Sequence, residues 1–257
     1  MLHIVDAHIH IGPWSRFYTP CSSVDSIISM MDRFGIQYAF ASHSIGLAGM
    51  PELGRNLSEQ AFAQSKGRIL SYLVFDPMQL AESMRIIEAN VSAPFFAGIK
   101  IHPTQHNCSA DDERYRPVWE LAHQKGLVLL AHTWDRSSYH PEQNNSHPDL
   151  FEKYISSYPD TRIILGHAGG HYSASRAVRL VKKYNNVWVD ISGDSYALGR
   201  IDYLVSEMGS KRVLFGSDMP WAEPEHAIGE ILAANLNSEQ CEDILGLNAV
   251  RLFNLPV

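Results

Sequence analysis

Eight short apolar runs recur at intervals along this chain of 257 residues, and helical patterns fill the gaps between them. Each run is rich in Val, Ile, Leu or aromatic residues and ends at Gly, Pro, Asp or His, as buried β-strands do. The runs cover residues 2–9, 36–42, 69–75, 96–101, 127–131, 161–166, 187–192 and 212–217. Regular alternation of apolar strands with helices predicts a parallel sheet covered by helices.

The intervening segments carry the apolar period of amphipathic helices. Residues 24–31 place apolar side chains at i, i+3, i+4 and i+7, residues 174–181 repeat that spacing, and residues 80–87 show a narrower stripe. Eight strand–helix units in about 250 residues predict an α/β fold of the (β/α)8 TIM-barrel type. A doubly wound sheet is the alternative, but the GxGxxG phosphate fingerprint expected after its first strand is absent.

The domain organisation is simple, because no internal repeat, low-complexity tract or Pro/Gly/Ser-rich linker divides the chain. We interpret residues 1–257 as a single domain. The pattern of Ser238–Phe253 predicts an extra C-terminal helix that packs on the barrel exterior through Cys241, Ile244, Leu245 and Leu252. Thr133–Pro148 is predicted to be a long loop after the fifth strand and a candidate substrate lid.

Composition narrows the partners and the compartment. A formal net charge of -7 without any Lys/Arg cluster gives no electrostatic reason for nucleic acid or acidic lipid to bind, so a small-molecule substrate is expected. No apolar stretch approaches the ~18 residues of a membrane span. The three cysteines are widely spaced and form no CxxC, and the first strand leaves no room for a signal peptide. These features predict a cytoplasmic protein and leave a homo-oligomer open.

Ligand-type side chains gather where the expected strands end. Asp6, His8 and His10 share one face of the first strand, because successive side chains point to opposite sides. In a (β/α)8 barrel the carboxyl ends of all strands meet around one mouth, where active sites are built. Neutral imidazoles and a carboxylate are ligands that zinc prefers, so the pattern predicts a transition-metal site. The other residues of this kind are Lys100, His102, His132, His167 and Asp218.

The order of these motifs resembles the amidohydrolase superfamily, particularly its amidohydrolase-related branch of metal-dependent hydrolases, lactonases and decarboxylases. The resemblance spans residues 6–253 and includes the motifs at 98–103, 165–170, 216–221 and 248–253. It implies that one divalent metal ion, expected to be zinc, is held by His8, His10, His132 and Asp218. It also implies that Asp218 is the general base and that His167 approaches the metal-bound water or the substrate oxygen.

The resemblance leaves a second metal open. In binuclear members the strand-six histidine, here His167, binds the second metal, and a strand-four lysine, here Lys100, is carboxylated and bridges both. A lysine paired with an acid inside the barrel is the alternative for Lys100. His102 either lines the mouth or helps to end its strand before Pro103. Asp6 is expected to orient a ligand histidine or to cap the barrel floor.

Several aromatic and cationic residues follow strands and are expected at the mouth. Aromatic walls and a guanidinium suit a planar or carboxylated substrate. The candidate substrate contacts are His102, Trp14, Arg16, Trp134 and Arg136, with Tyr139, His171, Tyr172, Asp194 and Trp221 on the same side.

Three functions compete for this site. The sequence favours a metal-dependent hydrolase that uses a metal-activated water on an amide, lactone or related carbonyl substrate. The alternative enzyme is a metal-dependent non-oxidative decarboxylase of an aromatic or conjugated acid. The motif residues are common to both, but an arginine directed at the metal would favour decarboxylation. A barrel that binds metal only as a sensor or structural module would need a closed site with four protein ligands.

Overall fold

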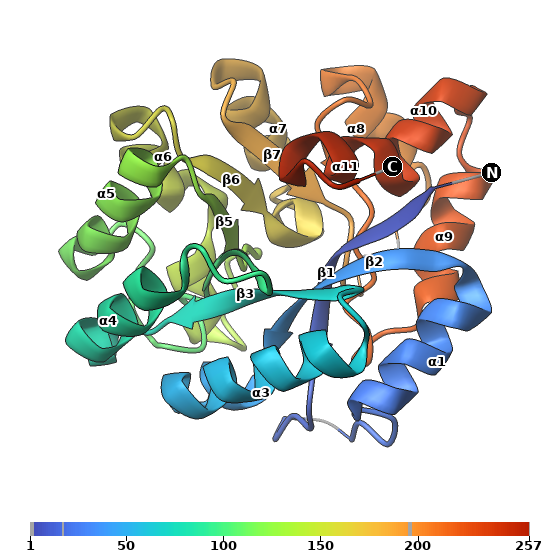
Figure 1. Cartoon of the computed structure of the whole chain (residues 1–257). Helices are drawn as coiled ribbons and strands as arrows, with labels where there is room; N and C mark the ends of the chain where they lie inside the picture. The colour runs from blue at the N-terminus through green and yellow to red at the C-terminus, as the bar shows by residue number, and fades with distance from the viewer. Residues whose placement is uncertain (1–2, 17, 195–196, 257) are drawn as a thin grey trace.

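Eight parallel strands lie side by side in chain order in the computed structural model, which describes residues 3–16, 18–194 and 197–256 (Figure 1). The strands are β1 (Ile4–Ile11), β2 (Ile36–His43), β3 (Ile69–Phe75), β4 (Phe96–Ile101), β5 (Val128–Ala131), β6 (Arg162–Leu165), β7 (Val187–Asp190) and β8 (Val213–Leu214). The predicted (β/α)8 barrel, a single domain, is confirmed.

The barrel closes between β1 and the segment that follows β8. The amide of Ala7 donates to the carbonyl of Phe215 at 2.9 Å, and that of Asp218 donates to the carbonyl of His8 at 2.9 Å. Strand β8 has two residues, shorter than the run predicted at 212–217, because the chain leaves the regular ladder at Phe215. Leu2, where the first strand was expected to begin, lies outside the described residues.

Amphipathic helices cover the outside of the barrel, as their apolar period predicts. In α1 the Ser23 side chain accepts from the amide of Ser26 at the start, and Gly35 ends the helix in the left-handed conformation at φ 67°. The helices are α1 (Val24–Phe34), α2 (Ser44–Leu47), α3 (Pro51–Gln64), α4 (Leu80–Asn90), α5 (Arg116–Lys125), α6 (Pro148–Ser157), α7 (Ala174–Lys183), α8 (Arg200–Met208), α9 (Pro224–Ala233), α10 (Ser238–Glu242) and α11 (Asn248–Phe253). No helix in the described ranges is long and apolar enough to cross a membrane.

The C-terminal segment differs from the single helix expected at Ser238–Phe253. It consists of α10, a π-helical turn η5 (Asp243–Leu247) and α11. Ala249 and Leu252 join the apolar cluster inside the barrel, and the Phe253 ring stacks on Phe40 with centroids 4.0 Å apart. The expected packing on the exterior is therefore wrong for α11, although Ile244 and Leu245 do join the outer core.

This arrangement closes the end of the barrel at which the strands begin, and Figure 1 shows α11 beside the C-terminus. Apolar side chains inside the barrel need cover from water at that end, and α11 supplies it. The ligand-type residues His10, His132 and Asp218 lie at the opposite end, where the strands finish.

Candidate active site

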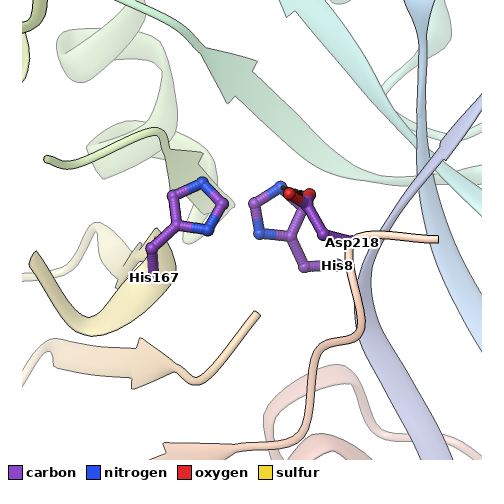
Figure 2. A group of neighbouring side chains, drawn as sticks. All are labelled: His8, His167 and Asp218. Carbon is purple, nitrogen blue, oxygen red and sulfur yellow. Dashed lines mark ion pairs between the residues drawn. The ribbon is translucent and has the colours of Figure 1, made fainter. Parts of the chain in front are cut away.

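Three ligand-type side chains converge at the carboxyl ends of the strands. One side-chain ligand atom from each of His8, His167 and Asp218 lies within 4.8 Å of the others, and we call this group the His–Asp cluster. They come from β1, from the turn η4 (Gly166–Gly169) after β6 and from the segment after β8, and their side chains point toward a common space (Figure 2). The barrel thus brings together residues from both ends of the chain.

Two further predicted ligands contact this cluster. Nε2 of His10 lies 3.1 Å from Oδ1 of Asp218, and Nδ1 of His132 lies 3.0 Å from Nε2 of His167. Nε2 of His8 lies 3.6 Å from the same Asp218 oxygen. The predicted ligands His8, His10 and Asp218 therefore adjoin one another, and His132 joins them through its contact with His167.

The backbone is strained at two residues of the His–Asp cluster. His167 has φ 61° and Asp218 has φ 66°, in a left-handed region that only a few per cent of non-glycine residues adopt. Backbone strain of this kind persists where the surrounding structure holds it, often at active sites. Gly193 makes room for one of them, since a Cβ there would lie 2.7 Å from Nδ1 of His167.

A buried carboxylate that sequence analysis missed supports the cluster from behind. Oδ2 of Asp190, the last residue of β7, accepts a hydrogen bond from Nδ1 of His8 at 3.0 Å. Oδ1 accepts from the amide of His167 at 3.0 Å and from Oγ of Ser192 at 2.5 Å. Because a carboxylate only accepts, Nδ1 of His8 carries the proton and its Nε2 presents a lone pair to the cluster.

The same reasoning identifies the protonated ring nitrogen of His132 and of His167. Nε2 of His132 donates to Oε1 of Gln143 at 3.1 Å, so its Nδ1 is unprotonated. Nδ1 of His167 donates to Oγ of Ser192 at 3.0 Å, so its Nε2 is unprotonated. Two lone pairs thus face each other across 3.0 Å between His132 and His167.

Such a contact between lone pairs is repulsive unless a cation lies near both of them. Oδ1 of Asp218 is buried and has no aligned hydrogen-bond donor among the described residues, in spite of its short contact with His10. Unpartnered acceptors of these kinds, imidazole nitrogen and carboxylate oxygen, are the donor set of a divalent transition metal. The residues present therefore fit the metal site that the sequence predicts.

The protonation states match this use. Burial lowers the pKa of His10 to about 3 and that of His167 to about 4, so both imidazoles are neutral at pH 7. Burial opposes ionisation of Asp218, but its contact with His10 and the neighbouring His167 and His8 hold its pKa well below the usual range. His10 and His167 therefore offer neutral nitrogens, and Asp218 offers an ionised oxygen, without losing protons first.

Lys100 lies inside the barrel beside the cluster. Its Nζ is 2.8 Å from Nε2 of His8, so the structure gives it an imidazole partner in place of the acid considered in the sequence analysis. Burial lowers the pKa of Lys100 to about 8. The ammonium group thus places a positive charge next to the lone pair of His8. Carboxylation of Lys100 and a second metal remain predictions.

A cavity of about 1050 Å³ opens onto these residues. Trp14, Trp134 and Trp221 contribute to its walls, and the Trp221 ring stacks on His10 with centroids 3.5 Å apart. Arg16 lines the cavity and pairs with Glu142, with Nη1 and Oε1 3.5 Å apart.

The remaining candidate substrate contacts divide into two groups. Arg136 is exposed and is not among the residues that line the cavity, so the structure gives no support for it as a substrate contact. His102 fulfils both roles considered for it: it lines the cavity, stacking on His132 at 4.1 Å, and its Nδ1 accepts from the amide of Gln105 directly after β4. Asp6 accepts from the amides of His8 and Ser217, so it positions backbone and not an imidazole.

The sequence profile of the amidohydrolase family matches residues 5–255. The chain belongs to the amidohydrolase family. No curated protein sequence matches this family member.

Solved structures of similar fold include several decarboxylases. They are 2,6-dihydroxybenzoate decarboxylase from Rhizobium (TM-score 0.79, 17% identity, 99% of each chain), 5-carboxyvanillate decarboxylase from Sphingomonas paucimobilis (0.74, 17%, 100% of each chain) and dihydroxybenzoic acid decarboxylase from Polaromonas sp. JS666 with bound manganese (0.78, 17%, 99% of this chain and 98% of that chain). At this level of identity the similarity establishes the shared fold.

Proposed function

We propose that this amidohydrolase-family protein is a metal-dependent non-oxidative decarboxylase of an aromatic or conjugated carboxylic acid. The observation that carries the proposal is the cavity, whose tryptophan walls lead to the His–Asp cluster. Aromatic walls favour a planar substrate, because indole rings stack on flat π-systems. Three structural neighbours named above as decarboxylases of hydroxylated benzoic acids support the same substrate class.

Arg16 adds a further element to this proposal. It lines the cavity, and a guanidinium binds a carboxylate through two parallel hydrogen bonds. Its present partner is Glu142 at 3.5 Å. Half of the Arg16 side chain is exposed to water, so this ion pair is weak. A carboxylate or phenolate of the substrate can therefore compete for Arg16.

The proposed metal ligands are His8, His10, His132 and Asp218, and His167 completes the pocket. Zinc is expected from the donor set, and manganese is the ion named in the Polaromonas structure. When bound, the divalent ion supplies positive charge that stabilises the negative charge of the reacting substrate.

Decarboxylation breaks the bond between a ring carbon and its carboxylate, and the bonding electron pair stays on the carbon. Carbon dioxide leaves, and a proton must reach that carbon to give the arene. Asp218 is ionised at neutral pH, so it can take a proton from a substrate hydroxyl group or from water and return it to the carbon. Nε2 of His167 is also unprotonated and faces the same space, which makes it a second acceptor.

Hydrolysis of an amide or lactone, the function favoured by the sequence, is the alternative for the same site. Asp218 would then take a proton from the attacking water, and no arginine would be needed. The cavity with Arg16 and aromatic walls gives decarboxylation the better support.

The experiment is a substrate screen with the purified protein loaded with zinc or manganese. Hydroxylated benzoic acids and conjugated dienoic acids are compared with lactones and anilides, and released carbon dioxide and hydrolysis products are both measured. We expect carbon dioxide from one or more of the acids, released on the order of 10²-fold more slowly by Asp218→Asn. Turnover of lactones or anilides alone would overturn the decarboxylase proposal.

A further inference from the structure

We infer that Gln143 is a positioning residue of the metal site, which makes the segment expected to act as a lid part of the metal centre. The inference rests on the metal site proposed above. Gln143 lies in the 3-10 turn η3 (Pro141–Ser146), within the loop after β5. Its amide oxygen is 3.1 Å from Nε2 of His132.

The contact decides which nitrogen of His132 faces the cluster. An amide oxygen only accepts, so Nε2 of His132 donates and Nδ1 keeps the lone pair that points to His167. Histidine ligands in metal sites ordinarily donate their second ring N–H to such an acceptor, which fixes tautomer and ring orientation. Asp190 does this for His8, and Gln143 does it for His132.

The position of Gln143 is itself fixed by the loops on both sides. Oγ1 of Thr104, after β4, donates to Oε1 of Gln143 at 2.9 Å. Oγ of Ser146 accepts from the amide of Thr104 at 3.0 Å, and the carbonyl of Ser146 accepts from the amide of Trp134 at 3.1 Å. Oγ1 of Thr104 also lies 2.7 Å from Oγ of Ser146, so Thr104 and Ser146 together hold the side-chain amide of Gln143 beside His132.

The same turn also contacts the mouth of the cavity. Glu142, next to Gln143, pairs with Arg16, a residue that lines the cavity, at 3.5 Å. Adjacent residues of one turn therefore contact a candidate substrate residue and a candidate metal ligand. Displacement of this turn would move both contacts together.

The test compares Gln143→Leu with two variants. Gln143→Glu keeps an accepting oxygen at the same place, and Asn144→Leu changes the neighbouring residue of the turn, whose side chain accepts from the amide of Ser137 and does not contact His132. Zinc affinity is measured by competition with a chelator. The tautomer of His132 is read from ¹⁵N shifts of zinc-loaded, histidine-labelled protein, its signals being identified by their loss in His132→Asn.

We expect Gln143→Leu to bind zinc about 10–100-fold more weakly, the usual effect of losing such an acceptor, and to shift the His132 nitrogen signals. Gln143→Glu and Asn144→Leu are expected to stay within about threefold of the wild type. Unchanged affinity and unchanged shifts in Gln143→Leu would overturn the inference and leave the metal site intact. Equal losses in Gln143→Leu and Asn144→Leu would also overturn it, since packing of the turn would then be responsible. Absence of zinc binding by the wild type would overturn the proposed function as well.

Discussion

Replacement of Asp190 by Asn tests whether the carboxylate behind the cluster prepares His8 to bind metal. Asp190 accepts four hydrogen bonds, from Nδ1 of His8, the amide of His167, and the amide and hydroxyl of Ser192. Asn retains an oxygen at the position of Oδ1, which receives three of these four hydrogen bonds. Its NH2 group replaces Oδ2 and meets the N–H of His8, so His8 must change tautomer and protonate Nε2.

The expected magnitude follows from that single lost acceptor. A hydrogen bond to a charged group contributes about 1.5–3 kcal/mol, and this carboxylate is fully buried. Since about 1.4 kcal/mol corresponds to a factor of ten, zinc should bind Asp190→Asn about 10–100-fold more weakly. The free energy of unfolding of the metal-free protein should fall by ~1–3 kcal/mol.

The assay is zinc competition with a chelator, together with urea unfolding of the metal-free protein. Asp6→Asn is the matched control, because Asp6 is an equally buried carboxyl that accepts from the amides of His8 and Ser217 in place of an imidazole. Burial raises the pKa of Asp6 to about 7, so its neutral form is already populated and Asn should mimic it. If Asp190→Asn bound zinc like the wild type, the assignment of His8 Nε2 as a ligand atom would be refuted.

Three further predictions address the chemistry, the acid limit and the fold. Asp218→Asn should retain bound metal by elemental analysis and lose on the order of 10²-fold in kcat, and near-normal turnover with metal in place would exclude Asp218 as the proton carrier. Burial lowers the pKa of His43 from 6.5 to about 4, so only the unfolded chain takes up this proton in that window. The contribution of His43 to the free energy of unfolding should therefore be fully present above pH 6.5, and about 3 kcal/mol of it should be lost by pH 4. Urea unfolding at pH 7 and pH 4.5 should show a smaller decrease in this free energy for His43→Asn than for the wild type. An equal decrease in the two proteins would contradict this prediction. Gly98→Ala would place a Cβ 2.4 Å from the carbonyl oxygen of Val128, so the unfolding free energy should fall by about 1–3 kcal/mol or more, and an unchanged urea midpoint would contradict the packing.

Much of this fold could be predicted because the barrel repeats one local pattern. The apolar runs and helical stripes identified all eight strands, and two strand boundaries, Ile69–Phe75 and Phe96–Ile101, agree to the residue. The floor of the barrel could not be predicted. Leu252 and Phe253 fit an exterior helix equally well in sequence, and only the three-dimensional path of the chain places them against Phe40.

The candidate site could likewise be predicted only in part. His8, His10, His132, His167 and Asp218 stand at strand ends, where the pattern marks them, and the structure brings them into contact.

Their supporting groups were harder to identify. Asp190 ends the apolar run Val187–Val189 as Asp218 ends its own, so a signal existed and was overlooked. Gln143 had none, because an amide in a polar loop acquires its role only when η3 docks between Thr104 and Trp134.

The fate of solvent atoms tests the central claim most directly. The metal-loaded protein is incubated with the compound of the screen that it turns over fastest, in D2O and separately in H2¹⁸O, and the organic product is analysed by mass spectrometry. Decarboxylation predicts one deuterium on the ring carbon that carried the carboxylate, and no ¹⁸O in the arene. Incorporation of ¹⁸O into a new carboxylate or hydroxyl group, without deuterium at carbon, would show hydrolysis and contradict the account.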